Sequence, residues 1–373
     1  MNPLVPLADP LPQPAPPALV WALLQLSFLL HVVAMNLVLG GSLLALHWGF
    51  SRRGEDAPLR ARLLVAWDKA LPVAVAATVT LGVAPLLFVQ LLYGRVFFTS
   101  SILMGWYWLA LVPLVIVGYY GAYARAFRGD GLGRAGRWVS LAVAAAFAAA
   151  AFVQATNATR SLRPETFAAA YAADPRGLSL NLGDPSFWPR YLHLLLGAVA
   201  VAALGLAVLG ASRRRAEPEF ARWAVRRGTT LFAVATAANV FAGMAFLIAL
   251  PKPLLLRLVG GDAWSMTLLA GGILLAVALA GAALLALGAR NPVAGTAGLA
   301  ALLLATLALM LLLRDDLRRL ALRQAGVEAP TWVAPQWGPF SLFVACLLAA
   351  AGTIAWMVHA LARGVPGGSE EAR

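Results

Sequence analysis

Residues Leu29 to Gly49 read LLHVVAMNLVLGGSLLALHWG, and this stretch decides what kind of fold the chain adopts. Almost every side chain in it is apolar, and its length is close to the roughly 20 residues that a helix needs to cross a bilayer. Lipid cannot satisfy an unpaired backbone amide, so a run of this kind must be helical. The stretch therefore predicts a transmembrane helix that carries the imidazoles of His31 and His47.

The rest of the chain repeats this pattern from end to end. Of its 373 residues, 61% are hydrophobic and 12% are charged, whereas soluble domains carry about 25% charged residues. We therefore expect an all-α, polytopic membrane helix bundle of about nine transmembrane helices, with no soluble domain between them. The expected spans cover residues 18–50, 68–93, 100–126, 136–156, 190–212, 227–250, 264–289, 293–313 and 339–362.

The basic residues set the expected orientation. Arginine is concentrated in the loops after the first, third and fifth spans. Basic loops stay in the cytoplasm, so the N-terminus is expected outside and the C-terminus in the cytoplasm. This orientation explains the formal charge of +13 without nucleic acid, and membrane lipid is the expected partner. Residues 1–373 are expected to form a single integral membrane domain, with a Pro-rich outer tail at 1–17 and a cytoplasmic tail at 364–373.

The chain contains one cysteine, Cys346. A single thiol cannot supply a cysteine-ligated iron–sulfur cluster or the paired cysteines of covalent haem attachment. We therefore expect no iron–sulfur cluster and no covalently attached haem.

Histidine is the one ionisable residue expected inside the spans. His31 and His193 lie near the outer boundary of the expected hydrocarbon layer, and His47 and His359 lie near the inner boundary. Every aspartate and glutamate is expected in a loop, at a span end or in a tail.

Two expected outer loops are long, at 157–189 and 314–338. The second begins RDDLRRLALRQ, which is also compatible with an amphipathic helix on the membrane surface.

An imidazole in hydrocarbon needs a partner, and three roles remain open for it. It can hydrogen-bond a neighbouring helix, transfer protons, or ligate a haem iron through a neutral nitrogen. Met266 opens the seventh span on the same side as His193, so its thioether is a candidate partner for His193, with ordinary packing as the alternative. His47 and His359 are candidates for an inner haem, with histidines extending to the surface from helix ends as the alternative.

Four stretches carry a resemblance to a known family. They are HVVAMNLVLGGSLLAL from His31, RYLHLLLGAVAVAALGLAVLGA around His193, SMTLLAGGILL around Met266, and ATNATRSLRP from Ala155. The first three resemble the first, fifth and seventh helices of subunit I of cytochrome bd quinol oxidase, and the fourth resembles the end of that subunit's fourth helix. The expected nine spans and outer N-terminus also agree with this family.

The resemblance implies haem b as the cofactor. It implies that His193 and Met266 ligate the iron of a low-spin haem, and that His31 holds a second haem or is the relic of its site. It also implies a bacterial cytoplasmic membrane, with a quinol as a candidate electron donor. A second membrane subunit and an outer-face c-type cytochrome are candidate protein partners.

The chain departs from this family at the sites of oxygen and quinol chemistry. The third span, SSILMGWYWLALVPLVIVGYY, lacks the family's glutamates, and the last span lacks its glutamate ligand. The family's quinol-binding loop is reduced to LPKPLLLRLVGGDAWS, at 250–265, without the Gly-Arg-Glu-Phe signature. Protons that reach a buried haem travel through titratable groups, so these losses favour electron transfer over oxygen reduction.

We therefore expect a haem-b-binding electron-transfer subunit that passes electrons between a membrane donor such as quinol and a carrier at the outer face. One alternative is a functional bd-type terminal quinol oxidase subunit with altered ligands. A second alternative is a permease or structural membrane subunit without haem, in which the histidines only join helices.

Overall fold

The computed structural model describes residues 12–50, 54–288, 292–327 and 332–363. The expected tail at 364–373, and most of the one at 1–17, lie outside the described residues. Within the described part, nine helices are long and apolar enough to cross a membrane, which confirms the expected all-helical bundle. They are α1 (Pro17–Phe50), α2 (Ala57–Leu103), α3 (Gly105–Arg128), α4 (Ala135–Arg160), α6 (Phe187–Ser212), α7 (Pro218–Ile248), α9 (Ala263–Leu287), α10 (Pro292–Gln324) and α11 (Trp337–Arg363).

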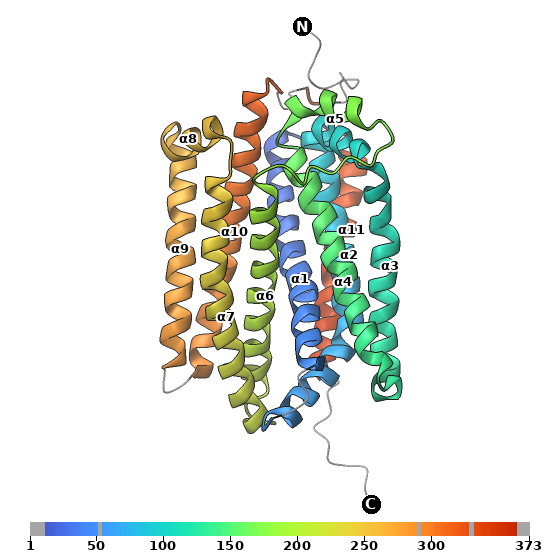
Figure 1. Ribbon diagram of the computed structural model, residues 1–373, viewed down its shortest axis with the longest axis vertical. Coiled ribbons are helices and arrows are strands. Elements are labelled where there is room, and N and C mark those ends of the chain that lie inside the picture. Colours follow the sequence, from blue (N-terminus) through green and yellow to red (C-terminus); the bar gives the residue numbers. More distant parts are fainter. Residues whose placement is uncertain (1–11, 51–53, 289–291, 328–331, 364–373) are drawn as a thin grey trace, which may run out of the picture.

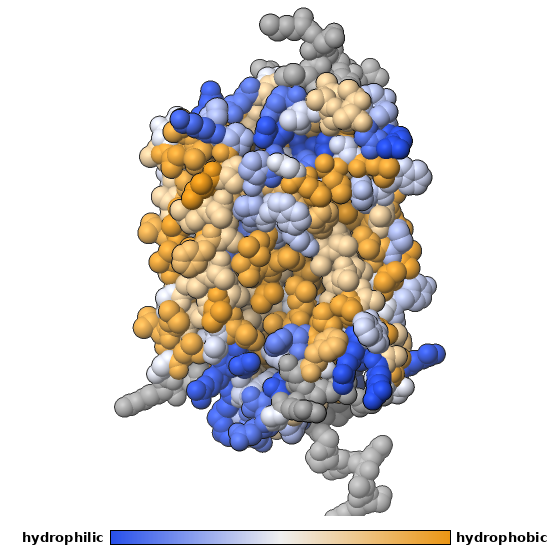
Figure 2. Space-filling model, viewed as in Figure 1, coloured by the Kyte–Doolittle hydropathy of each residue, from blue (hydrophilic) through white to orange (hydrophobic). Residues whose placement is uncertain are grey.

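Four short elements connect the long helices, and two of them distinguish the ends of the bundle. They are the 3-10 helices η1 (Gly129–Leu132) and η2 (Pro164–Thr166), and the α-helices α5 (Phe167–Ala173) and α8 (Lys252–Gly260). In Figure 1, α5 and α8 lie at the same end of the bundle as the start of α1. The arginine-rich loops predict that this end faces outward, and we call it the outer end. Figure 2 shows a broad hydrophobic band between two hydrophilic ends.

Helices α1, α6 and α7 form the centre of the bundle. α1 packs against α2, α4 and α6, and α6 packs against α7, while α3 and α9 lie at opposite edges (Figure 1). Small residues let helices approach closely in a membrane, and Ala198, Ala203 and Ala207 of α6 are fully buried. A Cβ atom on Gly40 would lie 1.9 Å from the Ala198 oxygen, and one on Gly228 would lie 2.6 Å from the Ala203 oxygen. These helices therefore meet backbone to backbone.

Helix α2 is much longer than the expected span at 68–93. It begins at Ala57 and continues to Leu103, with a bend at Tyr93, where the backbone adopts φ −130° and ψ 23°. The extension brings Asp68 inside the helix, where its carboxylate accepts hydrogen bonds from Arg125 of α3. The expected span ends two residues before Arg95, whereas the helix extends beyond both expected ends, and Arg62 in the added N-terminal part pairs with Glu217 at 2.8 Å.

Helix α10 corrects the expected outer loop at 314–338. The helix continues through the charged stretch to Gln324, so this stretch is neither a loop nor a separate surface helix. Asp315 is only 2% exposed and Asp316 5%, so these two carboxylates are buried at the outer end of the helix and do not lie in a solvated loop. Ion pairs along the helix stabilise it, such as the pair of Arg319 with Asp316 at 3.0 Å.

The described end of the Pro-rich N-terminal segment is packed onto the outer end. Gln13 is 2% exposed and donates a side-chain hydrogen bond of 2.7 Å to the Leu91 oxygen of α2. Its backbone nitrogen donates to the Trp332 oxygen at 2.8 Å. This short contact ties together the segments that precede α1 and α11.

Candidate functional site

His31 lies on α1 and faces α2. Its Nδ1 atom lies 3.0 Å from the backbone oxygen of Thr78. A carbonyl oxygen only accepts hydrogen bonds, so Nδ1 carries the proton and the Nε2 lone pair remains free. The imidazole lies directly on Gly82, where an added Cβ atom would come within 2.8 Å of the ring carbon Cε1. A glycine at this position allows the ring to reach the carbonyl.

His193 repeats this arrangement between α6 and α7. Its Nδ1 atom lies 3.1 Å from the backbone oxygen of Asn239. A Cβ atom on Gly243 would lie 3.2 Å from its Cε1 and Nδ1 atoms. In both sites the carbonyl belongs to one residue and the glycine follows it one helical turn later, so the imidazole covers a single turn of the neighbouring helix. We call each of these arrangements a glycine notch.

A glycine notch is compatible with two uses of an imidazole. The hydrogen bond joins two helices, as a purely structural histidine does. The same bond fixes the tautomer and orients the ring, which is how metal-ligating histidines are held by a backbone carbonyl. In both notches the unprotonated nitrogen is Nε2, the form that haem iron binds.

Met266 lies near the start of α9, at the same end of the bundle as His193. Its side chain is 44% exposed. Helix α9 packs mainly against α7, α8 and α10, and Figure 1 shows α7 between α9 and α6. The structure therefore does not bring Met266 and His193 together as it brings each histidine to its glycine.

The two inner histidines lie on the surface of the bundle. His47, in the last turns of α1, and His359, near the end of α11, are both exposed. Among the described residues, no group of three or more His, Cys, Asp or Glu side chains is placed to hold a metal ion.

A charged cluster at the outer end was missed by the sequence analysis. We call it the outer charge cluster, and it consists of Arg190 on α6 with Arg314, Asp315, Asp316, Arg318 and Arg319 on α10. The acid–base spacing within RDDLRR was the signal that could have revealed it, because charges one turn apart on a helix can pair.

Asp315 occupies the centre of this cluster. One carboxylate oxygen accepts a 2.7 Å hydrogen bond from the Trp21 indole of α1. The other accepts a 2.9 Å hydrogen bond from the Tyr93 hydroxyl of α2. Arg318 and Arg319 each approach this carboxylate to 3.8 Å. Asp315 therefore joins three helices, and both of its oxygens have partners.

Asp316 faces α9 instead. It lies 2.6 Å from the Ser265 hydroxyl, which also lies 2.9 Å from Asp262 at the start of α9. The hydroxyl has one proton, so it donates to one carboxylate at a time. Asp262 also accepts a hydrogen bond from the Ser265 backbone nitrogen at 3.1 Å, and these bonds hold the pKa of Asp262 below its usual range.

Two arginines of the cluster lie next to the histidine sites. Arg190 precedes His193 by one turn of α6, and its guanidinium carbon lies 4.6 Å from the centre of the Phe246 ring. The guanidinium carbon of Arg314 lies 4.5 Å from the centre of the Phe28 ring. The Phe28 ring centre is in turn 6.2 Å from that of His31.

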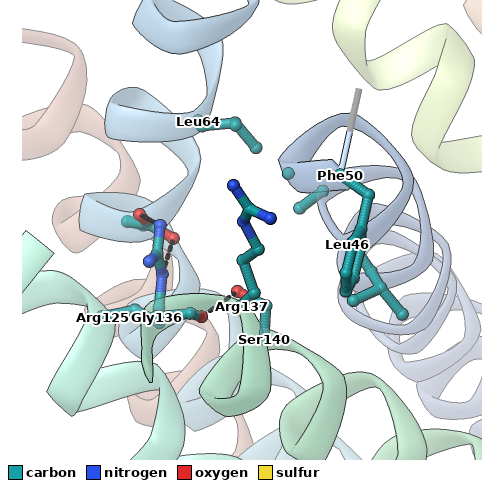
Figure 3. A pocket seen from close by; sticks show the side chains of 10 residues that line it. Leu46, Phe50, Leu64, Arg125, Gly136, Arg137 and Ser140 are labelled. Atoms are coloured by element: carbon teal, nitrogen blue, oxygen red, sulfur yellow. Dashed lines mark hydrogen bonds and ion pairs between the residues drawn. The ribbon is translucent and has the colours of Figure 1, made fainter. Parts of the chain in front are cut away.

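The opposite end of the bundle contains a second polar feature, a small cavity of about 30 Å³ between α1, α2, α3 and α4. Arg125 donates hydrogen bonds to the Asp68 carboxylate, and Figure 3 shows Arg125 on one side of the cavity and the Arg137 side chain extending between Leu64 and Phe50. A cavity of this size holds about one water molecule. It suits local hydration of these charges rather than a substrate.

Comparison with known proteins supports the fold. No protein-family model and no curated protein matches the sequence. Among solved structures, the chain is similar to a chain of the bd oxidase from Geobacillus thermodenitrificans, with a TM-score of 0.69 at 15% sequence identity. The match covers 95% of this chain and 100% of the other. At this identity the similarity establishes a bd-oxidase-like fold and leaves the cofactors to be argued from the residues.

Proposed function

We propose that this chain is a haem-b-binding subunit of a bd-oxidase-like assembly in a bacterial cytoplasmic membrane, and that it transfers electrons between a membrane donor such as quinol and a carrier at the outer face. The observation that carries this proposal is the repeated glycine notch. Two imidazoles in separate helix pairs are held through Nδ1 by a backbone carbonyl, with Nε2 free for a ligand.

Haem suits these residues better than a bare metal ion does. A metal ion needs several protein ligands converging on one point, and no such group occurs among the described residues. The porphyrin itself supplies four nitrogen ligands to the iron, so the protein needs to supply only one or two more. A bound haem would supply one-electron chemistry, and the protein would set its orientation and electrostatics.

Each candidate residue has a separate role in this proposal. His193 would ligate the iron of one haem, and Met266 is retained as its second proposed ligand because it lies at the same outer end of the bundle, although α9 packs mainly against α7, α8 and α10. The exposure of Met266 makes this the weaker assignment. His31 is the proposed ligand of a second haem. An inner haem on His47 and His359 is not supported by their exposed positions.

A terminal oxidase is the second candidate, and the buried acids favour it more than the sequence did. Asp315 and Asp316 provide titratable groups inside the bundle, and Asp315 reaches α1 through Trp21. However, their oxygens are already engaged by Trp21, Tyr93, Ser265 and Arg319. We therefore retain electron transfer as the proposed activity.

The test is the reduced-minus-oxidised absorption spectrum of the purified protein. Wild type is expected to show the bands of haem b. His193→Ala is expected to remove most of the low-spin signal, and Met266→Leu to convert it to a high-spin form. His47→Ala, which removes an exposed imidazole, is the matched control and is expected to leave the spectrum unchanged.

Three outcomes separate the alternatives. A colourless protein from haem-sufficient cells would favour the permease or structural subunit. Oxygen uptake driven by quinol would favour the oxidase. A haem signal that survives both His193→Ala and His31→Ala would contradict the proposed ligands.

A further inference from the structure

We propose that Arg190 and Arg314 bind haem propionate groups at the outer end of the bundle, Arg190 those of a haem on His193 and Arg314 those of a haem on His31. This inference rests on the proposed function, because it assigns residues to a second part of the same cofactor. It is carried by the buried, unpartnered guanidinium donors of Arg190 one turn from His193, and by the position of Arg314 over Phe28, whose ring lies near His31.

The two arginines reach this position from different helices. Arg190 is on α6 and Arg314 is on α10, and these helices pack against each other. Arg318, one turn from Arg314 on α10, adds a third positive charge, and its guanidinium carbon lies 4.7 Å from the centre of the Tyr93 ring. Like charges of this kind are stable inside a bundle only when an anion compensates for them.

The protein's own acids in this region are engaged elsewhere. Asp315 is bound by Trp21 and Tyr93, and Asp316 by Ser265 and Arg319. Asp184, the other acid near Arg190, accepts its hydrogen bonds from Arg163 and Ser186.

The guanidinium of Arg190 therefore has unused donors. Its Nε and Nη2 atoms are buried and make no hydrogen bond to any described residue. Its contact with Phe246 covers one face of the guanidinium plane and leaves the donors in the plane available. A buried donor without a partner costs about 1–3 kcal/mol, and a charged one costs more. A planar carboxylate that accepts two parallel hydrogen bonds matches this fork of donors.

The position of the arginines explains why the anion would belong to haem. Arg190 lies one turn outward of His193 on the same face of α6, since residues three apart are neighbours on a helix. Phe28, whose ring contacts the Arg314 guanidinium, likewise lies one turn outward of His31 on α1. A porphyrin carries its iron at the centre and two carboxylates on one edge, so one molecule can reach both an imidazole and an arginine above it.

The experiment compares haem with its dimethyl ester, in which both carboxylates are masked. Full-length protein is produced in haem-deficient cells and titrated with each porphyrin in detergent, and binding is followed by absorbance. Wild type is expected to bind haem at least about tenfold more tightly than the ester, the value of one charge-assisted hydrogen bond. Arg190→Gln and Arg314→Gln are expected to lose that preference by weakening haem binding alone.

The controls keep the anchor separate from folding. Arg214→Gln removes the same charge from an exposed position at the opposite end and is expected to keep the full preference. Arg190→Lys keeps the charge but not the paired donors, and is expected to lose part of the preference. If Arg190→Gln fails to fold, Arg190→Lys and Arg314→Gln test the same prediction.

The outcomes distinguish this inference from the proposed function. If neither porphyrin binds wild type, the proposed function fails and the anchor fails with it. If both porphyrins bind equally well, haem binding stands and the anchor is wrong. A phospholipid that copurifies with wild type but not with Arg190→Gln, while porphyrin binding is unchanged, would assign the site to a lipid phosphate and also overturn the anchor.

Discussion

At the scale of single residues, the two glycine notches determine how the imidazoles are presented. Position along the chain predicted that His31 and His193 lie at similar depth. Their hydrogen-bond partners were not predictable, because Thr78 and Asn239 contribute backbone oxygens, which every residue has. The glycines are visible in the sequence, but the chain contains 34 of them, and only the fold shows which ones face a histidine.

Gly82→Ala tests the notch at His31. An added methyl group would meet the imidazole at 2.8 Å and displace it from the Thr78 carbonyl, so we expect a destabilisation of about 1–3 kcal/mol. The melting temperature in detergent measures this effect. Gly281→Ala makes the same change where an added Cβ meets no neighbour within 4 Å, and it is expected to be neutral or stabilising. Equal melting temperatures for the two variants would contradict the notch.

Asp315→Asn tests the centre of the outer charge cluster. The substitution preserves the shape of the side chain but removes the charge that faces Arg318 in a buried position. Breaking a buried ion pair by removing one partner typically costs 3–5 kcal/mol, and we expect about 3 kcal/mol here because the amide can still accept a hydrogen bond from Trp21. Asp174→Asn, in an exposed ion pair with Arg176, is the control. No measurable change is expected for it in the same unfolding assay.

Asp262 gives the outer end a dependence on pH. Hydrogen bonds from Ser265 lower the pKa of this carboxyl in the folded protein. The stabilisation is therefore fully present above the carboxyl's usual pKa of about 3.9 and is lost as the pH falls through the lower folded value. We expect the melting temperature of wild type to fall more steeply below about pH 4 than that of Asp262→Asn. Parallel curves for the two proteins would show that the cap contributes nothing.

At the scale of elements, α10 shows where hydropathy fails as a guide. The nine spans were predicted because lipid demands long apolar runs, and α4, α6 and α9 begin and end close to the expected residues. The expected end of the eighth span at Leu313 marks the first charges, not the end of the helix. Asp315 and Asp316 accept hydrogen bonds from residues on other helices, and partners of that kind are set by the tertiary structure.

Accessibility to a water-soluble maleimide tests the continuation of α10. In a Cys346→Ala background, Ala321→Cys is expected to resist labelling, since Ala321 is 5% exposed in the structure. Arg323→Cys, on the exposed side of the same turn, is the matched control and is expected to react. If 314–324 were a solvated loop, both cysteines would react at similar rates.

At the scale of the whole molecule, the orientation remains a prediction from charge. Impermeant maleimide applied to intact cells is expected to label Leu182→Cys, in the segment between α5 and α6, but not Arg214→Cys, between α6 and α7. Both positions are exposed. Opening the cells should expose the second cysteine. The opposite pattern would place the outer charge cluster and both glycine notches on the cytoplasmic side.

The architecture as a whole was predictable, and the site only in part. Composition and periodicity were sufficient for an all-helical membrane bundle, and the similarity in fold to a bd oxidase agrees with the family suggested by the stretches around His31 and His193. The placement of Met266 away from α6 and the burial of Asp315 depend on how helices distant in sequence are arranged. No local pattern in the chain encodes that arrangement.

The tight contact of α1, α6 and α7 limits how this protein can work. Gly40 lies against the Ala198 backbone and Gly228 against that of Ala203, so rocking of one helix against another at these two contacts would bring backbones into collision. Carriers that alternate between two open faces depend on such rocking. A rigid interior agrees instead with the proposed electron transfer. Electrons tunnel between cofactors held at a constant distance, and no conformational change is required.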